Sequence, residues 1–292
     1  MSRRRFAAAG LLAMVSCVVA AEQPRHSNPL PPPPVSARQG AFIYAGELTQ
    51  GGWIRGQAPT GTVSARLDDQ PLVLDATRHF FAAFDRDAGA SAMLIARLSD
   101  GSTVQAPLAI SPRAWDIEHV DIPLTVGKTT EEFLAIRKPE LARIAAARAV
   151  ESSTDGWKQR FIWPARGRIS GKFGSQRIYR GGVAGAYHSG IDIAAGAGAP
   201  IVAPADGVVV LAAEQPFSLE GHLLMVDHGA GLNSAFLHCS QLAVKVGDAV
   251  RQGQVIAYIG MTGRATGPHL HWSLMWRGSR LDPLLFTGPM PQ

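Results

Sequence analysis

His269 and His271 are the residues whose types and spacing first suggest chemistry in this chain, because they stand two apart after a glycine-rich run at 260–268. In a β-strand, residues i and i+2 lie on one face, so both imidazoles would point the same way. Such a pair suits a metal ion or proton transfer, although a histidine more often sits in an ordinary hydrogen bond. The pair therefore needs partners from elsewhere in the chain.

His188 and Asp192 are candidate partners. On a strand, these two residues would share a face with Gly190, whereas Ile191 and Ile193 would pack inward. Taken alone, a histidine and an aspartate at this spacing more often form a structural hydrogen bond than a metal site. Joined by one histidine from the other pair, His188 and Asp192 offer two imidazoles and a carboxylate and leave a fourth position for water, as in a catalytic zinc site. The spacing does not decide which of the two later histidines would be the third ligand.

His238 and the cysteines refine this hypothesis. Cys17 and Cys239 are the two cysteines of the chain, so a structural zinc site built from several cysteines is excluded. His238 ends an apolar run, a position from which its side chain can project into a groove. Near a metal it could act as a base or stabilise an oxyanion. Its neighbour Cys239 is expected to be a small, buried, apolar thiol.

The elements that must position these residues are expected to be mainly β-strands, because 31 glycines and 20 prolines indicate many turns. A small β-sandwich is expected over 41–115, a helical connector over 116–160, a second β domain over 161–286 and a short tail over 287–292. The expected strands of the first domain are 43–48, 63–67, 72–74, 80–84, 93–98 and 104–110. Those of the second are 201–203, 207–212, 223–226, 234–237 and 254–259.

The connector changes to a helical pattern over 129–151. Thr129 or Thr130 can begin a helix, and Pro139 suits the first turn of a second helical segment. The expected apolar stripe of this helix consists of Leu141, Ile144, Ala145 and Ala149.

The first 40 residues are expected to be an export signal followed by a linker. Residues 1–21 combine Arg3–Arg5, a short apolar run and small residues at a cleavage site, which indicates an export signal peptide and also resembles a twin-arginine signal. In a competing interpretation, Cys17 ends a lipobox and becomes a lipidated N-terminus. Residues 22–40 form a stiff, proline-rich linker. Either interpretation exports the protein, and membrane association is expected only if Cys17 is lipidated.

Composition argues for a globular protein without a nucleic-acid partner. Hydrophobic residues make up 46% of the chain and charged residues 17%, which is not the composition of a disordered protein. The leader arginines account for three of the formal net charge of +5, and the remaining +2 or so is an ordinary surface balance. A monomer is expected, although the oligomeric state is open.

Several of these motifs occur in one order and together resemble the M23 (lysostaphin/LytM-like) zinc metallopeptidases. They are His188-x-x-x-Asp192, His238 after its apolar run, and Gly-Pro-His269-Leu-His271. The run 260–272 is similar to the family signature Gly-x-Thr-Gly-x-(Ser/Ala)-Thr-Gly-Pro-His-Leu-His. The resemblance covers about 161–286, including 246–256 and Asp282-Pro283. The preceding β domain and helix look like the accessory region of Gram-negative members.

The resemblance implies a LytM-like antiparallel β domain with an open groove and one zinc ion held by His188, Asp192 and His271. It further implies that His238 and His269 are catalytic histidines outside the metal shell. Zinc lowers the pKa of bound water and polarises a carbonyl, while neutral histidines move protons and stabilise an oxyanion. The implied activity is that of an exported periplasmic or cell-envelope enzyme that cuts peptidoglycan peptide cross-links, as a D,D-endopeptidase.

Three positions depart from the family pattern. His222 stands where members often have Asn and would add a titratable group to the groove. Phe236 replaces a common Tyr, and Cys239 replaces a Leu. None of these departures removes an implied ligand.

Three rival functions remain at this stage. A non-catalytic LytM-like activator of a cell-wall amidase typically loses metal ligands, which this chain keeps. A biotinyl or lipoyl carrier needs a lysine at a hairpin tip, where this chain has Asp206-Gly207, and Lys245 lies outside the expected motif. A protein-digesting metalloprotease of general specificity stays compatible with the sequence.

Overall fold

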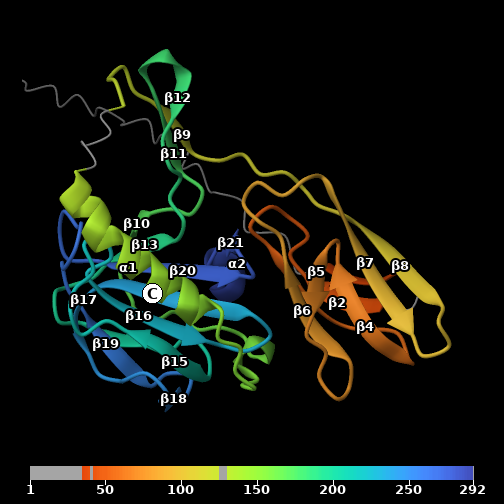
Figure 1. Ribbon diagram of the computed structural model, residues 1–292. Coiled ribbons are helices and arrows are strands. Elements are labelled where there is room, and N and C mark those ends of the chain that lie inside the picture. The colour runs from red at the N-terminus through yellow and green to blue at the C-terminus, as the bar shows by residue number, and fades with distance from the viewer. Residues whose placement is uncertain (1–34, 40–41, 125–129, 292) are drawn as a thin grey trace, which may run out of the picture. The chain divides into compact units, whose positions relative to one another are not determined.

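The computed structural model describes residues 35–39, 42–124 and 130–291, which all belong to one compact unit over 33–292 (Figure 1). The predicted signal peptide, Cys17 and Thr129 lie outside the described residues, as does most of the predicted proline-rich linker. Its last part, Val35–Gln39, is a strand. No helix among the described residues is long and apolar enough to span a membrane.

The first β region consists of two antiparallel four-stranded sheets, in the orders β1-β2-β3-β6 and β5-β4-β7-β8. Both sheets contribute side chains such as Phe42, Phe80 and Leu94 to the hydrophobic core, as expected of a two-sheet domain. Strand β3 was not predicted, because Arg55 and Gly56 interrupt its apolar pattern. The strands are β1 (Val35–Gln39), β2 (Phe42–Gly46), β3 (Trp53–Gln57), β4 (Thr62–Leu67), β5 (Gln70–Leu72), β6 (His79–Ala83), β7 (Ser91–Leu98) and β8 (Thr103–Ala109).

The second β region is built around a ten-stranded antiparallel sheet, which confirms the mainly β fold class. Its main path runs β10-β13-β20-β17-β16-β15-β18, while β19 joins β14 to β17, and β21 pairs with β20. The strands are β10 (Arg168–Gly171), β13 (Ile191–Ala194), β14 (Pro200–Val202), β15 (Gly207–Ala212), β16 (His222–Asp227), β17 (Leu232–Leu242), β18 (Ala249–Val250), β19 (Val255–Ile259), β20 (Leu270–Trp276) and β21 (Ser279–Leu281).

A small third sheet, in the order β12-β11-β9, joins one strand that follows the first region to two strands that lie between β10 and β13 in the chain. Its strands are β9 (Ile117–His119), β11 (Gln176–Tyr179) and β12 (Val183–Ala184), and β11 pairs with β9 in parallel. The short helices are η1 (Gly156–Lys158), η2 (Arg180–Gly182) and α2 (Leu284–Thr287).

Strands β13, β20 and β17 are adjacent and fix the positions of the candidate residues. His271 on β20 lies opposite Asp192 on β13 and opposite Leu237 on β17. The alternate side chains Ile191, Ile193 and Trp272 are fully buried. The period of two therefore places apolar groups in the core and polar groups on the other face.

Helix α1 (Glu131–Arg148) differs in two ways from the prediction. Thr130 caps it as predicted, but the helix is continuous through Pro139 instead of starting again there. Of the predicted stripe only Ile144 is buried, while Leu141 is 49% exposed, and the buried positions are Glu140, Ile144 and Ala147. The apolar pattern was misleading because the contact face of this helix includes charged residues.

Candidate metal centre

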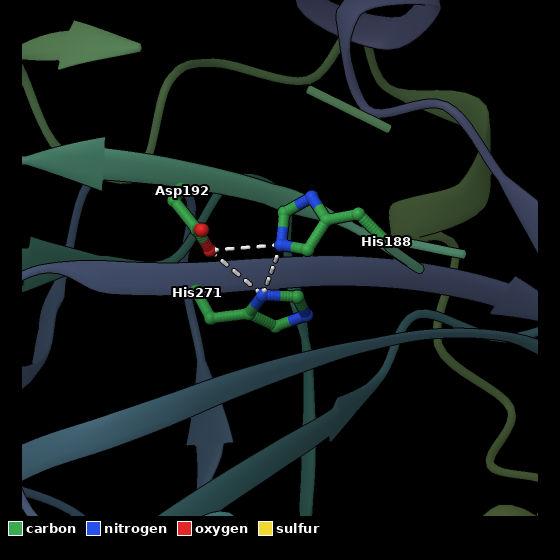
Figure 2. A group of neighbouring side chains, drawn as sticks. All are labelled: His188, Asp192 and His271. Carbon is green, nitrogen blue, oxygen red and sulfur yellow. Dashed lines mark hydrogen bonds and ion pairs between the residues drawn. The ribbon is translucent and has the colours of Figure 1, made fainter. Parts of the chain in front are cut away.

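His188, Asp192 and His271 converge on one point (Figure 2). The Asp192 Oδ1 atom lies 3.1 Å from His188 Nε2 and 2.8 Å from His271 Nδ1. The two imidazole nitrogens are 3.1 Å apart. Each residue thus turns one candidate ligand atom towards the others, and all three atoms lie within 4.8 Å of one another.

Strands β13 and β20 and the segment before β13 position these three side chains. Asp192 and His271 face each other across the β13–β20 ladder, whereas His188 lies in the segment just before β13. His188 Nδ1 lies 3.0 Å from the Lys172 carbonyl oxygen. A ring N–H that donates to this carbonyl leaves the lone pair on Nε2, the atom that faces Asp192.

The donor set fits a divalent metal such as zinc. Two imidazole nitrogens and one carboxylate oxygen are zinc ligands in catalytic sites, with one position left open. The nitrogens of His188 and His271 also face each other at 3.1 Å, and two neutral ring nitrogens cannot both direct lone pairs there without a proton or a cation between them. A cation held by both nitrogens and by Asp192 would satisfy this geometry.

The pKa values of two of these groups favour the ligand forms. Burial of Asp192 pushes its pKa upward, but hydrogen bonds from His188 and His271 outweigh burial and hold the pKa well below its usual range. Burial lowers the pKa of His271 and so favours the neutral ring. For His188, burial acts in the same direction, but the hydrogen bond to Asp192 prevails and raises the pKa.

His238 and His269 lie beside this group. Their ring centroids are 4.9 Å apart, and the His238 centroid is 6.4 Å from that of His271. His269 Nε2 is 3.8 Å from Asp192 Oδ1. The structure therefore brings together all five residues that the sequence singled out.

Each of these two rings is oriented by a backbone carbonyl. His238 Nδ1 lies 2.9 Å from the Thr262 carbonyl oxygen, and His269 Nδ1 lies 2.8 Å from that of Gly267. Donation from Nδ1 leaves Nε2 of each ring able to accept a proton. Burial lowers the pKa of His238, which favours its neutral form.

The carbonyls that orient the rings were missed by sequence reasoning. Those of Lys172, Thr262 and Gly267 act through the backbone, and any residue type offers the same group. No residue pattern could have identified them. The contact of Glu220 with His238, whose backbone N–H donates to the Glu220 carbonyl at 2.8 Å, is invisible in the sequence for the same reason.

Of the three positions that depart from the family pattern, Cys239 and His222 are not among the residues that converge at the metal centre. Cys239 is fully buried and burial raises its pKa to about 12, as expected of an inert thiol. His222 lines a cavity of about 520 Å³ together with Glu214, Ser240 and Lys245, and none of the five candidate site residues lines it. The open groove predicted at the metal centre stays a prediction.

Comparisons with known proteins agree with this geometry. A family model described as peptidase family M23 matches residues 186–283, which include every candidate ligand and both further histidines. The peptidoglycan DD-endopeptidase ShyA of Vibrio cholerae is 36% identical over 132 residues, which are 45% of this chain and 30% of that protein. The DD-carboxypeptidase/endopeptidase Mpg of Neisseria meningitidis is 37% identical over 105 residues, 36% of this chain and 24% of that protein. The chain thus matches less than a third of the length of these relatives.

The similarity to one solved structure extends beyond the matched domain. A crystal structure of a Pseudomonas aeruginosa protein, described as a peptidase M23, is 28% identical with a TM-score of 0.64. The alignment covers 83% of this chain and 96% of that one. The family match covers the three candidate ligands and the two histidines beside them. The chain therefore contains a peptidase family M23 domain, with the candidate metal centre inside it.

Proposed function

We propose that this protein is a zinc-dependent peptidoglycan endopeptidase that hydrolyses peptide cross-links of the cell wall, as a D,D-endopeptidase. The observation that carries the proposal is the convergence of His188 Nε2, Asp192 Oδ1 and His271 Nδ1 within an M23 domain, with His238 and His269 beside them. The name of the Vibrio relative, a peptidoglycan DD-endopeptidase, supports the substrate class, and the name of the Neisseria relative supports the endopeptidase activity.

In this proposal, His188, Asp192 and His271 hold the zinc ion. Zinc bound there would supply Lewis-acid activation of the attacking water and of the scissile carbonyl. Asp192, whose pKa is held low, brings the negative charge that offsets part of the charge of the cation.

His238 and His269 move protons in this proposal. The Nδ1 atom of each ring lies at hydrogen-bond distance from a backbone carbonyl, so the Nε2 atom is the one that can accept a proton from water. The ring that becomes protonated can then donate to the leaving amine. The other ring can donate to the oxyanion that develops on the carbonyl oxygen when it enters the step already protonated at Nε2.

The proposed location follows from the substrate. Peptidoglycan lies outside the cytoplasm, so the protein must be exported, either as a secreted protein or as a lipoprotein anchored through Cys17. Mass determination of the mature N-terminus from native cells distinguishes a lipid-modified Cys17 from a cleavage site near Ala20 and Ala21.

Product analysis tests the function. Purified cross-linked sacculi are digested with the zinc-loaded protein, and the muropeptides are identified by mass spectrometry. We expect cross-linked dimers to fall and monomers to rise, with a free D-alanine carboxyl at each cut, and we expect chelation to stop this. Unchanged sacculi in the presence of zinc would overturn the proposal and favour the non-catalytic activator. Cleavage that persists after complete chelation would overturn the zinc mechanism.

A further inference from the structure

Helix α1 precedes the matched M23 domain in sequence but packs onto its sheet. Ile144 and Ala147 of the helix are buried in a separate hydrophobic cluster with Leu211 of β15, Met225 of β16 and Phe217. Figure 1 shows the helix lying across the strands of this sheet. The helix therefore covers one face of the sheet that carries the metal centre.

Charged side chains of α1 hold the segment that contains Phe217. Arg137 donates from both terminal nitrogens to the two Glu220 carboxylate oxygens, each at 2.6 Å. Glu140 accepts from the Ser218 backbone N–H and hydroxyl, also at 2.6 Å each, and from Arg137 at 2.9 Å. The side chains of Arg137 and Glu220 are 13% and 16% exposed, so solvent weakens this two-pronged pair less than a surface ion pair.

The segment held in this way contacts the candidate site through its backbone. Phe217 and Gly221 exchange two backbone hydrogen bonds, at 2.8 and 2.9 Å, which close the segment into a tight loop. The Glu220 carbonyl then accepts from the His238 N–H at 2.8 Å, and the Leu219 carbonyl accepts from the Arg264 N–H at 2.9 Å.

The backbone of His238 needs this support. Its φ angle is +64°, in the left-handed region that non-glycine residues seldom adopt. Such a conformation persists when surrounding contacts determine it. The described contacts of His238 include the Glu220 carbonyl on its N–H and the Thr262 carbonyl near its ring. The first of these depends on the loop that Arg137 and Glu140 hold.

We propose that Arg137 and Glu220 form a positioning pair through which helix α1 sets the orientation of His238. The proposal rests on the proposed function for its catalytic consequence, since it assumes that His238 takes part in the reaction. Neither residue of the pair is a metal ligand or touches the reacting atoms. Loss of the pair removes one of the contacts that hold the 217–221 loop, and the His238 ring then shifts from its position beside His269. We expect the turnover number to fall while zinc content and KM stay unchanged.

Four variants test the pair through kinetics. We expect Arg137→Met and Glu220→Gln each to lower kcat about 10- to 100-fold, the range expected for a shift of a reacting group by about 1 Å. The double variant should lose no more than either single variant, because both remove the same interaction. Arg137→Lys keeps the charge and should recover part of kcat. Lys138→Met, at an exposed position of the same helix, is the matched control and should keep wild-type kcat.

Backbone hydrogen exchange at His238 gives a readout that does not need catalysis. We expect faster exchange of this amide in Arg137→Met and Glu220→Gln and an unchanged rate in Lys138→Met. Wild-type exchange in both variants, or a loss of kcat without faster exchange, would overturn the positioning pair. If Arg137→Met does not fold, Arg137→Lys is judged by the same two measurements. A wild-type protein that leaves sacculi uncut contradicts the proposed function instead, and the exchange rates then still decide the positioning pair.

Discussion

At the scale of single residues, two glycines determine how closely the candidate ligands approach one another. A Cβ atom on Gly171 would lie 2.4 Å from Asp192 Oδ2, and one on Gly190 would lie 2.8 Å from His271 Nε2 and 2.4 Å from the Trp272 carbonyl oxygen. A side chain introduced at either glycine position would displace a candidate ligand or the backbone beside it. The metal centre thus depends on residues that carry no chemistry of their own.

The first prediction concerns the ligands. Replacing His188 with Ala leaves one imidazole and one carboxylate in the shell, so we expect zinc content and cleavage of sacculi both to be lost, with the fold retained. Metal analysis after dialysis and muropeptide release measure these effects. His119→Ala, at an exposed position of β9, is the control and should keep both zinc and activity. Full zinc content in His188→Ala contradicts the assignment of this ligand.

The second prediction concerns pH. Burial lowers the pKa of His238 from its ordinary value of 6.5, so the ring stays neutral to lower pH than a free histidine. If the neutral ring takes part in proton transfer, kcat should begin to fall only below pH 6.5 as His238 becomes protonated. The pH profile of kcat, recorded with zinc content measured at each pH, tests this. A decline that begins well above pH 7, with zinc retained, contradicts the role of His238.

At the scale of elements, helix α1 shows how tertiary contacts override a local signal. Pro139 lies inside the helix, lacks a backbone N–H and cannot bond to the carbonyl of the residue four positions earlier. The helix continues because contacts on both sides of the proline hold it to the sheet. Arg137 and Glu140 bind the 217–221 loop, and Ile144 packs in the cluster beneath.

The third prediction follows from this helix. Replacing the exposed Pro139 with Ala supplies the missing N–H and removes the ring, so we expect a gain in unfolding free energy of up to about 3 kcal/mol. Activity should be unchanged, because the contacts of Arg137 and Glu140 do not involve the proline. Urea unfolding measures the gain, with Lys138→Ala as the control. A less stable Pro139→Ala variant would show that the proline itself shapes the helix.

At the scale of the whole molecule, the described part of the chain forms one compact unit in which buried polar groups tie segments far apart in sequence. Asp282, which is 1% exposed, pairs with Arg113 at 2.8 Å. His228 is fully buried, with Nδ1 at 2.8 Å from the Asp206 carbonyl oxygen and Nε2 at 2.7 Å from the Ser234 hydroxyl. Such groups make stability depend on pH.

The fourth prediction uses His228, whose pKa burial lowers from 6.5 to about 4. Between these values the unfolded chain binds a proton that the folded protein does not, so stability should fall as pH drops from 6.5 towards 4. The contribution is on the order of 3 kcal/mol at full protonation, since one pKa unit corresponds to about 1.4 kcal/mol.

Urea unfolding across this pH range tests the fourth prediction. His228→Gln cannot titrate, so its unfolding free energy should fall less steeply with decreasing pH than that of the wild type. A variant with the same steepness would show that other groups cause the pH dependence.

How much was predictable depends on the range of the interactions. The period of two in the strand predicted that Ile191 would pack inward, away from the face of Asp192, and it predicted the same of Ile193. Both predictions are confirmed, because side-chain alternation is a local property of the backbone. The motifs also identified all five residues that the structure brings together, and the resemblance named His271 as the third ligand where spacing alone left two choices.

Tertiary structure alone decided the rest. The β13–β20 register sets Asp192 opposite His271, and the carbonyls of Lys172, Thr262 and Gly267 orient the three other rings. The buried face of α1 was mispredicted because charged side chains of the helix have distant partners: Glu140 binds Ser218, 78 positions away in the chain, and Arg137 pairs with Glu220, 83 positions away. The sequence by itself determined which side chains carry the chemistry. Only the fold decided how they are held. Bonds to backbone carbonyls and pairs between distant residues cannot be recognised from residue type or from the local periodicity of the sequence.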